Sequence, residues 1–277
     1  MNQFEFLRYV NLGQYLPIKS LLHGLDPRAR IVTYMLIIAA VTFSKSPYGL
    51  LLGLLIVLLG FALGKIPIKF ALQGLIAPLP FLLIIAVLQL FITPGAEASV
   101  ALWQWRFLHI YQTGVVAAGM LLLRFTVLIL ALQLASYTLS TSELIYGMNK
   151  LLSPLAKIGI PTHDFVMVVQ ITIRFIPFLA QALERIAKAQ ASRGADWGTK
   201  GGSLLAKAKR VIPLILPLFM TSLQRAETMA MAMDARGYGS SRMRGSYLAM
   251  RFGMADAALI LFGVIAAAAI LLVQYLI

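Results

Sequence analysis

Long apolar runs constrain this chain more than any other feature. Five stretches contain at most one charged residue each, and they occupy residues 31–44, 50–64, 70–93, 113–137 and 255–277. A transmembrane helix needs about 20 mostly apolar residues; the last three stretches reach that length alone, and the first two approach it with their flanking residues. We therefore predict an all-α integral membrane protein with about five transmembrane helices.

The basic residues are spread unevenly along the chain. The 24 Lys and Arg exceed the 10 Asp and Glu, which gives a formal net charge of +14. Residues 140–252 hold 15 basic and 6 acidic residues, a net of +9, and the remainder holds 9 and 4, a net of +5. Lys and Arg collect on the cytoplasmic side of membrane proteins. The sequence thus predicts a cytoplasmic N-terminal segment with four transmembrane helices (1–139), a cytoplasmic helical domain (140–252) and a final transmembrane helix (253–277).

Two near-copies of one short phrase end the long helices that we predict at residues 165–193 and 203–235. The first tip is Ala191-Ser192-Arg193-Gly194, and the second tip is Asp234-Ala235-Arg236-Gly237. A cation is favoured at a helix C-terminus, and a glycine after it adopts a left-handed conformation. Each phrase alone therefore indicates a helix cap. Because both copies also share a Glu nine residues before the arginine (Glu184 and Glu227), a partner with two equivalent grooves is the second interpretation.

The first halves of these two helices are apolar on nearly all faces. Residues 165–179 and 211–222 have to be covered by the bilayer boundary, by each other or by a hydrophobic partner. Their other ends carry charge, so we expect them to reach into the cytoplasm. A helix of about 30 residues is roughly 45 Å long, so one such element can touch the membrane at one end and a soluble partner at the other.

Three smaller features give testable structural expectations. Asp26 is predicted to cap a helix that starts at Pro27, with a contact role for the same phrase equally open. Pro78 and Pro80 predict a kink within the span 70–93. Arg124 lies in the fourth span, where we favour an arginine that is paired internally or reaches the interface over one that contacts another subunit.

Two pairs of glycines predict close approach between membrane helices. The spacing of small residues four apart lets two helix backbones come together. The pairs are Gly49 with Gly53 and Gly60 with Gly64.

The chemistry of an enzyme is missing from the sequence. There is no Walker A motif, no His-Glu-x-x-His and no Gly-x-Ser-x-Gly, and there is no cysteine. We predict no catalytic residue, no cofactor and no metal site, and no nucleic-acid partner, because no DNA- or RNA-reading motif accompanies the charge. The chain is predicted to be a non-catalytic transducer. The alternative is a membrane enzyme or assembly factor that acts at the cytoplasmic lipid interface through the basic residues of 185–210. A third interpretation is a secondary carrier, which needs charged or polar residues within its spans. Only Arg124 clearly meets that requirement.

Several phrases carry a resemblance to a known family that extends over essentially the whole chain. They are Leu25-Asp26-Pro27-Arg28, Arg174-Phe175-Ile176-Pro177, the two tips, and Arg225-Ala226-Glu227 leading to Met233-Asp234-Ala235-Arg236-Gly237-Tyr238-Gly239. Together they resemble the transmembrane T component of energy-coupling factor (ECF) transporters. The paired Arg-Gly tips are the specific part, although the first tip has Ser192 where the family usually has Ala.

The resemblance implies the coupling subunit of an ABC-type importer for a vitamin or a transition-metal ion in a prokaryotic cell membrane, with the N-terminus and the coupling helices cytoplasmic. The implied partners are two ABC ATPases, in which ATPase activity resides, and a small membrane S component that binds the substrate. The residues implied to bind the ATPases are Ser192, Arg193, Gly194, Ala235, Arg236 and Gly237. The residues implied to form the coupling-helix platform for the S component are Arg174, Pro177, Pro213 and Pro217.

Overall fold

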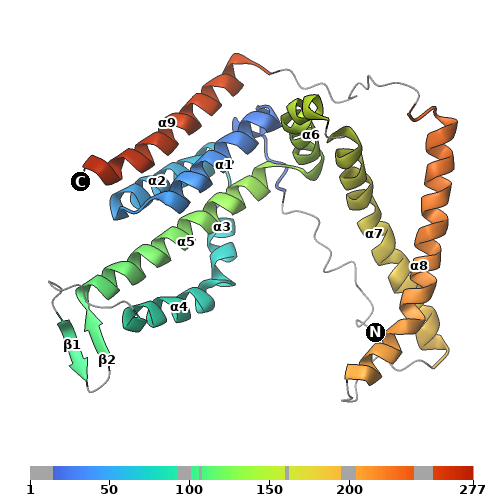
Figure 1. Ribbon diagram of the computed structural model, residues 1–277, viewed down its shortest axis with the longest axis horizontal. Helices are drawn as coiled ribbons and strands as arrows, with labels where there is room; N and C mark the ends of the chain where they lie inside the picture. Colours follow the sequence, from blue (N-terminus) through green and yellow to red (C-terminus); the bar gives the residue numbers. More distant parts are fainter. Residues whose placement is uncertain are drawn as a thin grey trace. The chain divides into compact units, whose positions relative to one another are not determined.

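The computed structural model describes residues 15–92, 101–105, 108–159, 162–194, 204–239 and 252–276 (Figure 1). The fold is all-α, as predicted, and among the described residues one short hairpin, β1 (Ala101–Trp105) with β2 (Leu108–Tyr111), is the only sheet. The short helices are η3 (Leu22–Gly24), α3 (Ile68–Ile76), α6 (Thr141–Leu152) and η4 (Ser153–Ile158). The longer helices are α1 (Pro27–Phe43), α2 (Pro47–Leu63), α4 (Leu79–Ile92), α5 (Gln112–Thr138), α7 (Thr162–Ser192), α8 (Leu204–Ala235) and α9 (Met254–Leu276).

The described elements form two compact units. One, which we call the α7–α8 unit, contains η4, α7 and α8, and the other, the larger unit, contains η3, α1–α6, the hairpin and α9. In the larger unit α1 packs against α9, α5 and α6, and α2 packs against α5 and α9. The side chains at the centre of this packing are completely or almost completely buried: Val41, Leu50, Val57, Val127 and Ile270.

Glycines allow the closest helix approaches in the larger unit. A Cβ placed on Gly49 would lie 2.7 Å from the carbonyl oxygen of Ile270 in α9, and one on Gly53 would lie 2.9 Å from a methyl carbon of Val41 in α1. A Cβ on Gly60 would overlap the side chain of Leu134 in α5. The prediction of close approach is therefore confirmed for these three glycines. Gly64 faces its own helix end, next to Ile66, rather than a neighbouring helix.

Within the described ranges, three helices are long and apolar enough to cross a membrane: α5, α9 and residues 164–192 of α7. The pair α3 and α4 makes a fourth if it is one broken span, and it is bent by 61° between Ile76 and Leu79. That bend confirms the kink expected from Pro78 and Pro80. The first two predicted spans are the 17-residue helices α1 and α2, which are about 25 Å long and lie at the lower limit for crossing the hydrocarbon core. The length and composition of α7 were not recognised in the sequence as those of a span.

The start of α1 is capped as the sequence predicts. The Asp26 side chain accepts a hydrogen bond from the Arg28 N–H at 2.9 Å, and Pro27 occupies the first helical position. The Asp26 N–H in turn donates to the Asp256 carboxylate at 2.7 Å, which ties the beginning of α1 to the beginning of α9. The phrase therefore contributes a helix cap and a contact between two helices of the same unit.

A buried ion pair joins α1 to α6. The Arg30 side chain is fully buried; it donates to the Thr138 carbonyl at 2.5 Å and to the Glu143 carboxylate at 2.9 Å. Glu143 also accepts from the Ser140 N–H, while its own N–H donates to the Ser140 hydroxyl, which is a capping box. Burial acts to raise the pKa of Glu143, but the hydrogen bonds from Ser140 and Arg30 and the Arg30 charge outweigh it and hold that pKa below its usual value.

Arg124 is paired within the larger unit. Its guanidinium donates to the carbonyl oxygen of Ser44, the residue that follows the last turn of α1, at 2.6 Å. A cation at this position also interacts favourably with the negative end of the α1 dipole. The internally paired interpretation of Arg124 is thus confirmed.

The α7–α8 unit is built from two long helices that cross (Figure 1). Both remain continuous through their internal prolines, Pro177 in α7 and Pro213 and Pro217 in α8. At the crossing, the Arg225 guanidinium lies over the Phe178 ring, 5.1 Å from its centre. Of the described side chains in this unit, few are buried: Thr162, Val166, Ala182, Ala187 and Leu214.

Candidate functional site

The two Arg-Gly tips have closely similar backbone geometry. Gly194 has φ +85° and Gly237 has φ +68°, the left-handed conformation expected after a helix C-terminus. In each tip the arginine N–H donates to the carbonyl three residues earlier, at 3.1 Å for Arg193 and 3.2 Å for Arg236. Each glycine N–H does the same, at 3.0 Å and 2.8 Å respectively. The repeated sequence therefore folds into a repeated turn.

The second tip is completed by a further hydrogen bond. The Tyr238 N–H donates to the Met233 carbonyl at 2.9 Å, five residues back, while the Gly237 N–H donates to the Asp234 carbonyl. This pair of bonds is a Schellman motif, which satisfies carbonyls at the end of a helix. The residues that follow Gly194 in the first tip, 195–203, lie outside the described part of the chain. They include part of the basic segment 185–210 on which the lipid-enzyme alternative rests.

The two tips lie at opposite ends of the α7–α8 pair. The second tip returns to the beginning of α7, where the Tyr238 hydroxyl lies 3.3 Å from the Asp164 carboxylate. The first tip ends α7, a helix of 31 residues and about 45 Å in length. The structure therefore does not bring Arg193 and Arg236 together. Ser192, Arg193, Gly194, Ala235, Arg236 and Gly237 are all exposed.

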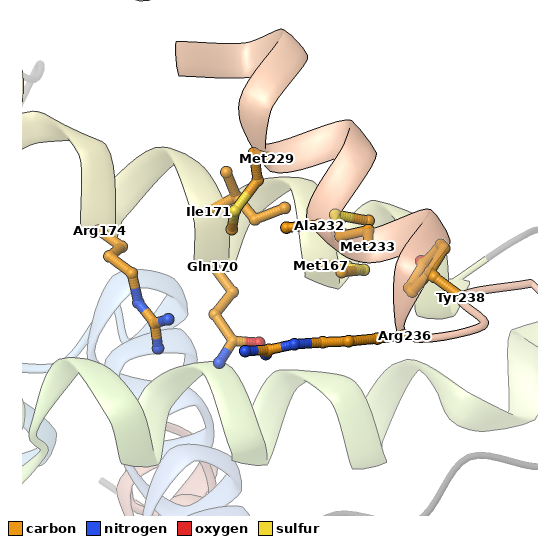
Figure 2. Close-up of a pocket in the computed structure, with 9 residues that line it drawn as sticks. All are labelled: Met167, Gln170, Ile171, Arg174, Met229, Ala232, Met233, Arg236 and Tyr238. Carbon is orange, nitrogen blue, oxygen red and sulfur yellow. The ribbon is translucent and has the colours of Figure 1, made fainter.

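The second tip instead borders a cleft between the first half of α7 and the last turns of α8, which we call the α7–α8 cleft (Figure 2). The cleft has a volume of about 450 Å³. Figure 2 shows the polar ends of Arg174, Gln170 and Arg236 along one edge and the methionines on the other side. The residues that line the cleft are Met167, Gln170, Ile171 and Arg174 from α7 and Met229, Ala232, Met233, Arg236 and Tyr238 from α8 and its terminal turn.

The cleft was not predicted from the sequence, although the sequence contains a signal for it. In α7 the lining residues are Met167, Gln170, Ile171 and Arg174, and in α8 they are Met229, Ala232, Met233 and Arg236. Both sets have the spacing i, i+3, i+4, i+7, which places four side chains on one face of a helix. Each stripe begins with Met and ends with Arg. Only their pairing across the cleft needed the structure.

The predicted platform residues are distributed along both helices. Arg174 lines the cleft together with Arg236, whereas Pro177 lies closer to the crossing, one residue from Phe178. Pro213 is exposed and Pro217 is half-buried, in a part of α8 whose apolar side chains are also largely exposed: Val211, Ile212, Ile215, Leu216 and Phe219. This surface has the character of one that lipid or an apolar partner covers.

The described residues hold no group of three or more His, Cys, Asp or Glu that could bind a metal ion. The side chains gathered at the cleft are guanidinium, amide, phenol and thioether groups. Such a set can bind an anion and an apolar group, because guanidinium donates several hydrogen bonds and methionine adapts its shape to its neighbours.

Comparison with known proteins gives concordant matches over most of the chain. The family described as "Cobalt transport protein" (CbiQ) matches residues 18–247. The energy-coupling factor transporter transmembrane protein EcfT of Acidaminococcus fermentans is 38% identical over 250 residues, 90% of each chain. EcfT of Clostridium kluyveri is 37% identical over 249 residues (88% of this chain and 91% of the relative), and EcfT of Bacillus selenitireducens is 31% identical over 265 residues (96% and 97%).

Proposed function

On the premise that the chain belongs to the family of energy-coupling factor transporter transmembrane proteins, we propose that it couples two cytoplasmic ABC ATPases to a small membrane S component. ATP binding and hydrolysis in the ATPases move α7 and α8. The S component, which holds a vitamin or a transition-metal ion, moves with them and releases its cargo into the cell. The chain itself contributes no catalytic group to this cycle.

One observation carries the proposal: two exposed arginines stand on matching helix-end turns at opposite ends of one helix pair. Each turn fixes an arginine next to a glycine that leaves its backbone accessible. A guanidinium presented in this way binds a carboxylate or carbonyls in a groove with defined geometry. Two equivalent tips, well separated, suit two ATPase subunits that each contribute one groove.

The exposed apolar face of α8 supports the second half of the proposal. Ile212, Leu216 and Phe219 are each more than half exposed, at 56%, 62% and 57%. Together with Arg174, Pro177, Pro213 and Pro217, this face forms the platform that we assign to the S component. Movement of either helix then changes the surface on which the S component rests.

The test is removal of both guanidiniums. We expect Arg193→Ala with Arg236→Ala to abolish co-purification of the ATPases when all subunits are co-expressed, while the chain still inserts in the membrane. Each single change is expected to weaken retention less, because two linked contacts act at high effective concentration. Retention is measured by affinity pull-down in mild detergent followed by quantitation of each subunit.

A matched control removes two charges elsewhere on α7. Arg185 and Lys188 are exposed and outside both tips, so Arg185→Ala with Lys188→Ala is expected to retain both ATPases. Full retention of the ATPases by the double tip variant would rule out the assignment of the tips. Turnover of a lipid substrate by the purified chain alone would favour the enzyme alternative instead.

A further inference from the structure

The α7–α8 cleft concentrates positive charge without a matching negative group. Among its nine described lining residues, Arg174 and Arg236 are charged and none is a carboxylate. Asp164, close to the second tip, is in hydrogen-bond contact with Tyr238. Two guanidiniums on one edge repel each other, so an anion placed between them is stabilised by both.

The opposite side of the cleft is apolar. Met167, Ile171, Met229 and Met233 present a thioether and aliphatic surface, as Figure 2 shows above the row of polar ends. Methionine side chains are flexible and accommodate apolar groups of irregular shape. A ligand that satisfies both sides has an anionic head and an apolar tail, and the volume of about 450 Å³ falls within the range of small-molecule sites.

The helix that forms one wall of the cleft is suited to a membrane. Residues 164–192 of α7 are long and apolar enough to span one, and the cleft begins in the first turns of this segment, at Met167 and Gln170. Anionic phospholipids are plentiful ligands at the membrane surface, and basic pockets between helices bind their head groups. An acidic peptide would match the guanidiniums equally well, but it would leave the four apolar side chains without a partner.

We propose that the α7–α8 cleft binds one anionic phospholipid, whose phosphate lies between Arg174 and Arg236 and whose acyl chain lies against the methionines. Gln170 donates a further hydrogen bond to the head group from the same edge. The site goes beyond the proposed coupling function and needs neither the ATPases nor the S component in order to bind lipid. Arg236 is also an ATPase-binding residue of the proposed function and Arg174 a predicted platform residue, so bound lipid competes with those partners for the same guanidiniums. It makes one coupling-helix tip responsive to lipid composition, while the other tip lies at the far end of α7.

The experiment uses the full chain, purified without partner subunits and reconstituted in phosphatidylcholine nanodiscs. A phosphatidylglycerol analogue with a photoactivatable acyl chain is added, and the labelled peptides are mapped by mass spectrometry. We expect label on the peptides that contain Met229 and Met233, with competition by unlabelled phosphatidylglycerol and none by added phosphatidylcholine. Equal labelling by a phosphatidylcholine analogue would overturn the proposal.

Two variants probe the two sides of the cleft independently. Arg174→Gln removes one guanidinium and is expected to lower this labelling about tenfold, the effect of losing one charge-assisted contact. Ala232→Phe keeps both arginines but fills the apolar side, and it is expected to cause a similar loss. Ala232 is exposed, so this variant folds even if the change at Arg174 does not. Arg185→Gln, on the same helix but outside the cleft, is the control and is expected to label like the unchanged chain.

Three further outcomes would contradict the proposal. Unchanged labelling in both Arg174→Gln and Ala232→Phe would show that the lipid binds elsewhere. Complete displacement of the analogue by inorganic phosphate would show an anion site without a role for the acyl chain. Displacement by an acidic peptide at lower concentration than by phosphatidylglycerol would identify the cleft as a protein-binding site.

Discussion

The larger unit and the α7–α8 unit are both rich in apolar residues, but they differ in how many side chains they bury and in how their arginines are paired. The larger unit encloses a continuous core in which Val41, Leu50 and Val127 are fully buried, and its buried Arg30 finds partners inside the unit. Both units expose apolar side chains, but few described side chains of the α7–α8 unit are buried, and its Arg174 and Arg236 border a cleft whose lining contains no carboxylate. The difference teaches that composition alone does not separate a helix that completes a core from one that is built to be covered by lipid or a partner.

The largest expected effect on stability comes from breaking the buried ion pair of the larger unit. Arg30→Ala leaves the partly buried Glu143 carboxylate without its cationic partner, and removal of one member of a buried pair costs about 3–5 kcal/mol. We expect a clear fall in the unfolding temperature of the purified chain, which is measured by far-UV circular dichroism. Arg185→Ala in α7 removes an exposed arginine and is expected to change stability by less than about 0.5 kcal/mol. Equal loss in the two variants would contradict the contrast between the units.

A smaller effect is expected where helices of the larger unit meet. Gly49→Ala places a methyl group 2.7 Å from the Ile270 carbonyl oxygen, and such overpacking costs about 1–3 kcal/mol. Gly119→Ala is the matched change in α5, where a Cβ meets nothing within 4 Å, and it is expected to be neutral or to stabilise the helix by about 0.5–1 kcal/mol. Thermal unfolding of both variants, measured in the same detergent, separates close packing from helix propensity. Similar changes for both variants would show that close packing at Gly49 does not matter.

The smallest change in stability is expected at a tip of the α7–α8 unit. Gly194→Ala forces an alanine into φ +85°, which costs about 1–2 kcal/mol locally, although nothing lies within 4 Å of its Cβ. On the proposed function, the altered turn weakens ATPase retention in the pull-down while the unfolding temperature of the larger unit stays the same. Gly194→Asn is the control, because asparagine tolerates this conformation better than alanine, and it is expected to retain more ATPase. If alanine and asparagine reduce retention equally, the turn conformation is not what the partner requires.

The features that could be predicted from the sequence are those that neighbouring residues determine. The Asp26 cap, the bend near Pro78 and the left-handed Gly194 and Gly237 each follow from residues a few positions apart, and the structure has all of them. The close approach at Gly49 was also predictable, because spacing along one helix marks the face on which a neighbour comes near.

The features that were missed depend on residues far apart in the chain. The separation of the two tips follows from the way α7 and α8 cross, and the cleft requires Met167 and Met233 to meet from two helices. The partner of Arg30 is Glu143, more than a hundred residues later, and no local pattern identifies it. The apolar length of α7, which is sufficient for a span, was masked by the charged residues in its second half, and those residues favoured the prediction of a cytoplasmic helix.

The hydrogen bond from Arg124 to the Ser44 carbonyl joins two groups that are synthesised at different times. The two groups are 80 residues apart, so at about 5–20 residues per second the end of α1 waits roughly 4–16 seconds for its partner to be translated. During that time the last carbonyls of α1 depend on water or lipid head groups, and Arg124 then enters the membrane at an energetic cost until it reaches them. Arg124 therefore reaches its carbonyl partner only when α1 is already in place, so this hydrogen bond belongs to the packed pair of α1 and α5 and not to either helix alone.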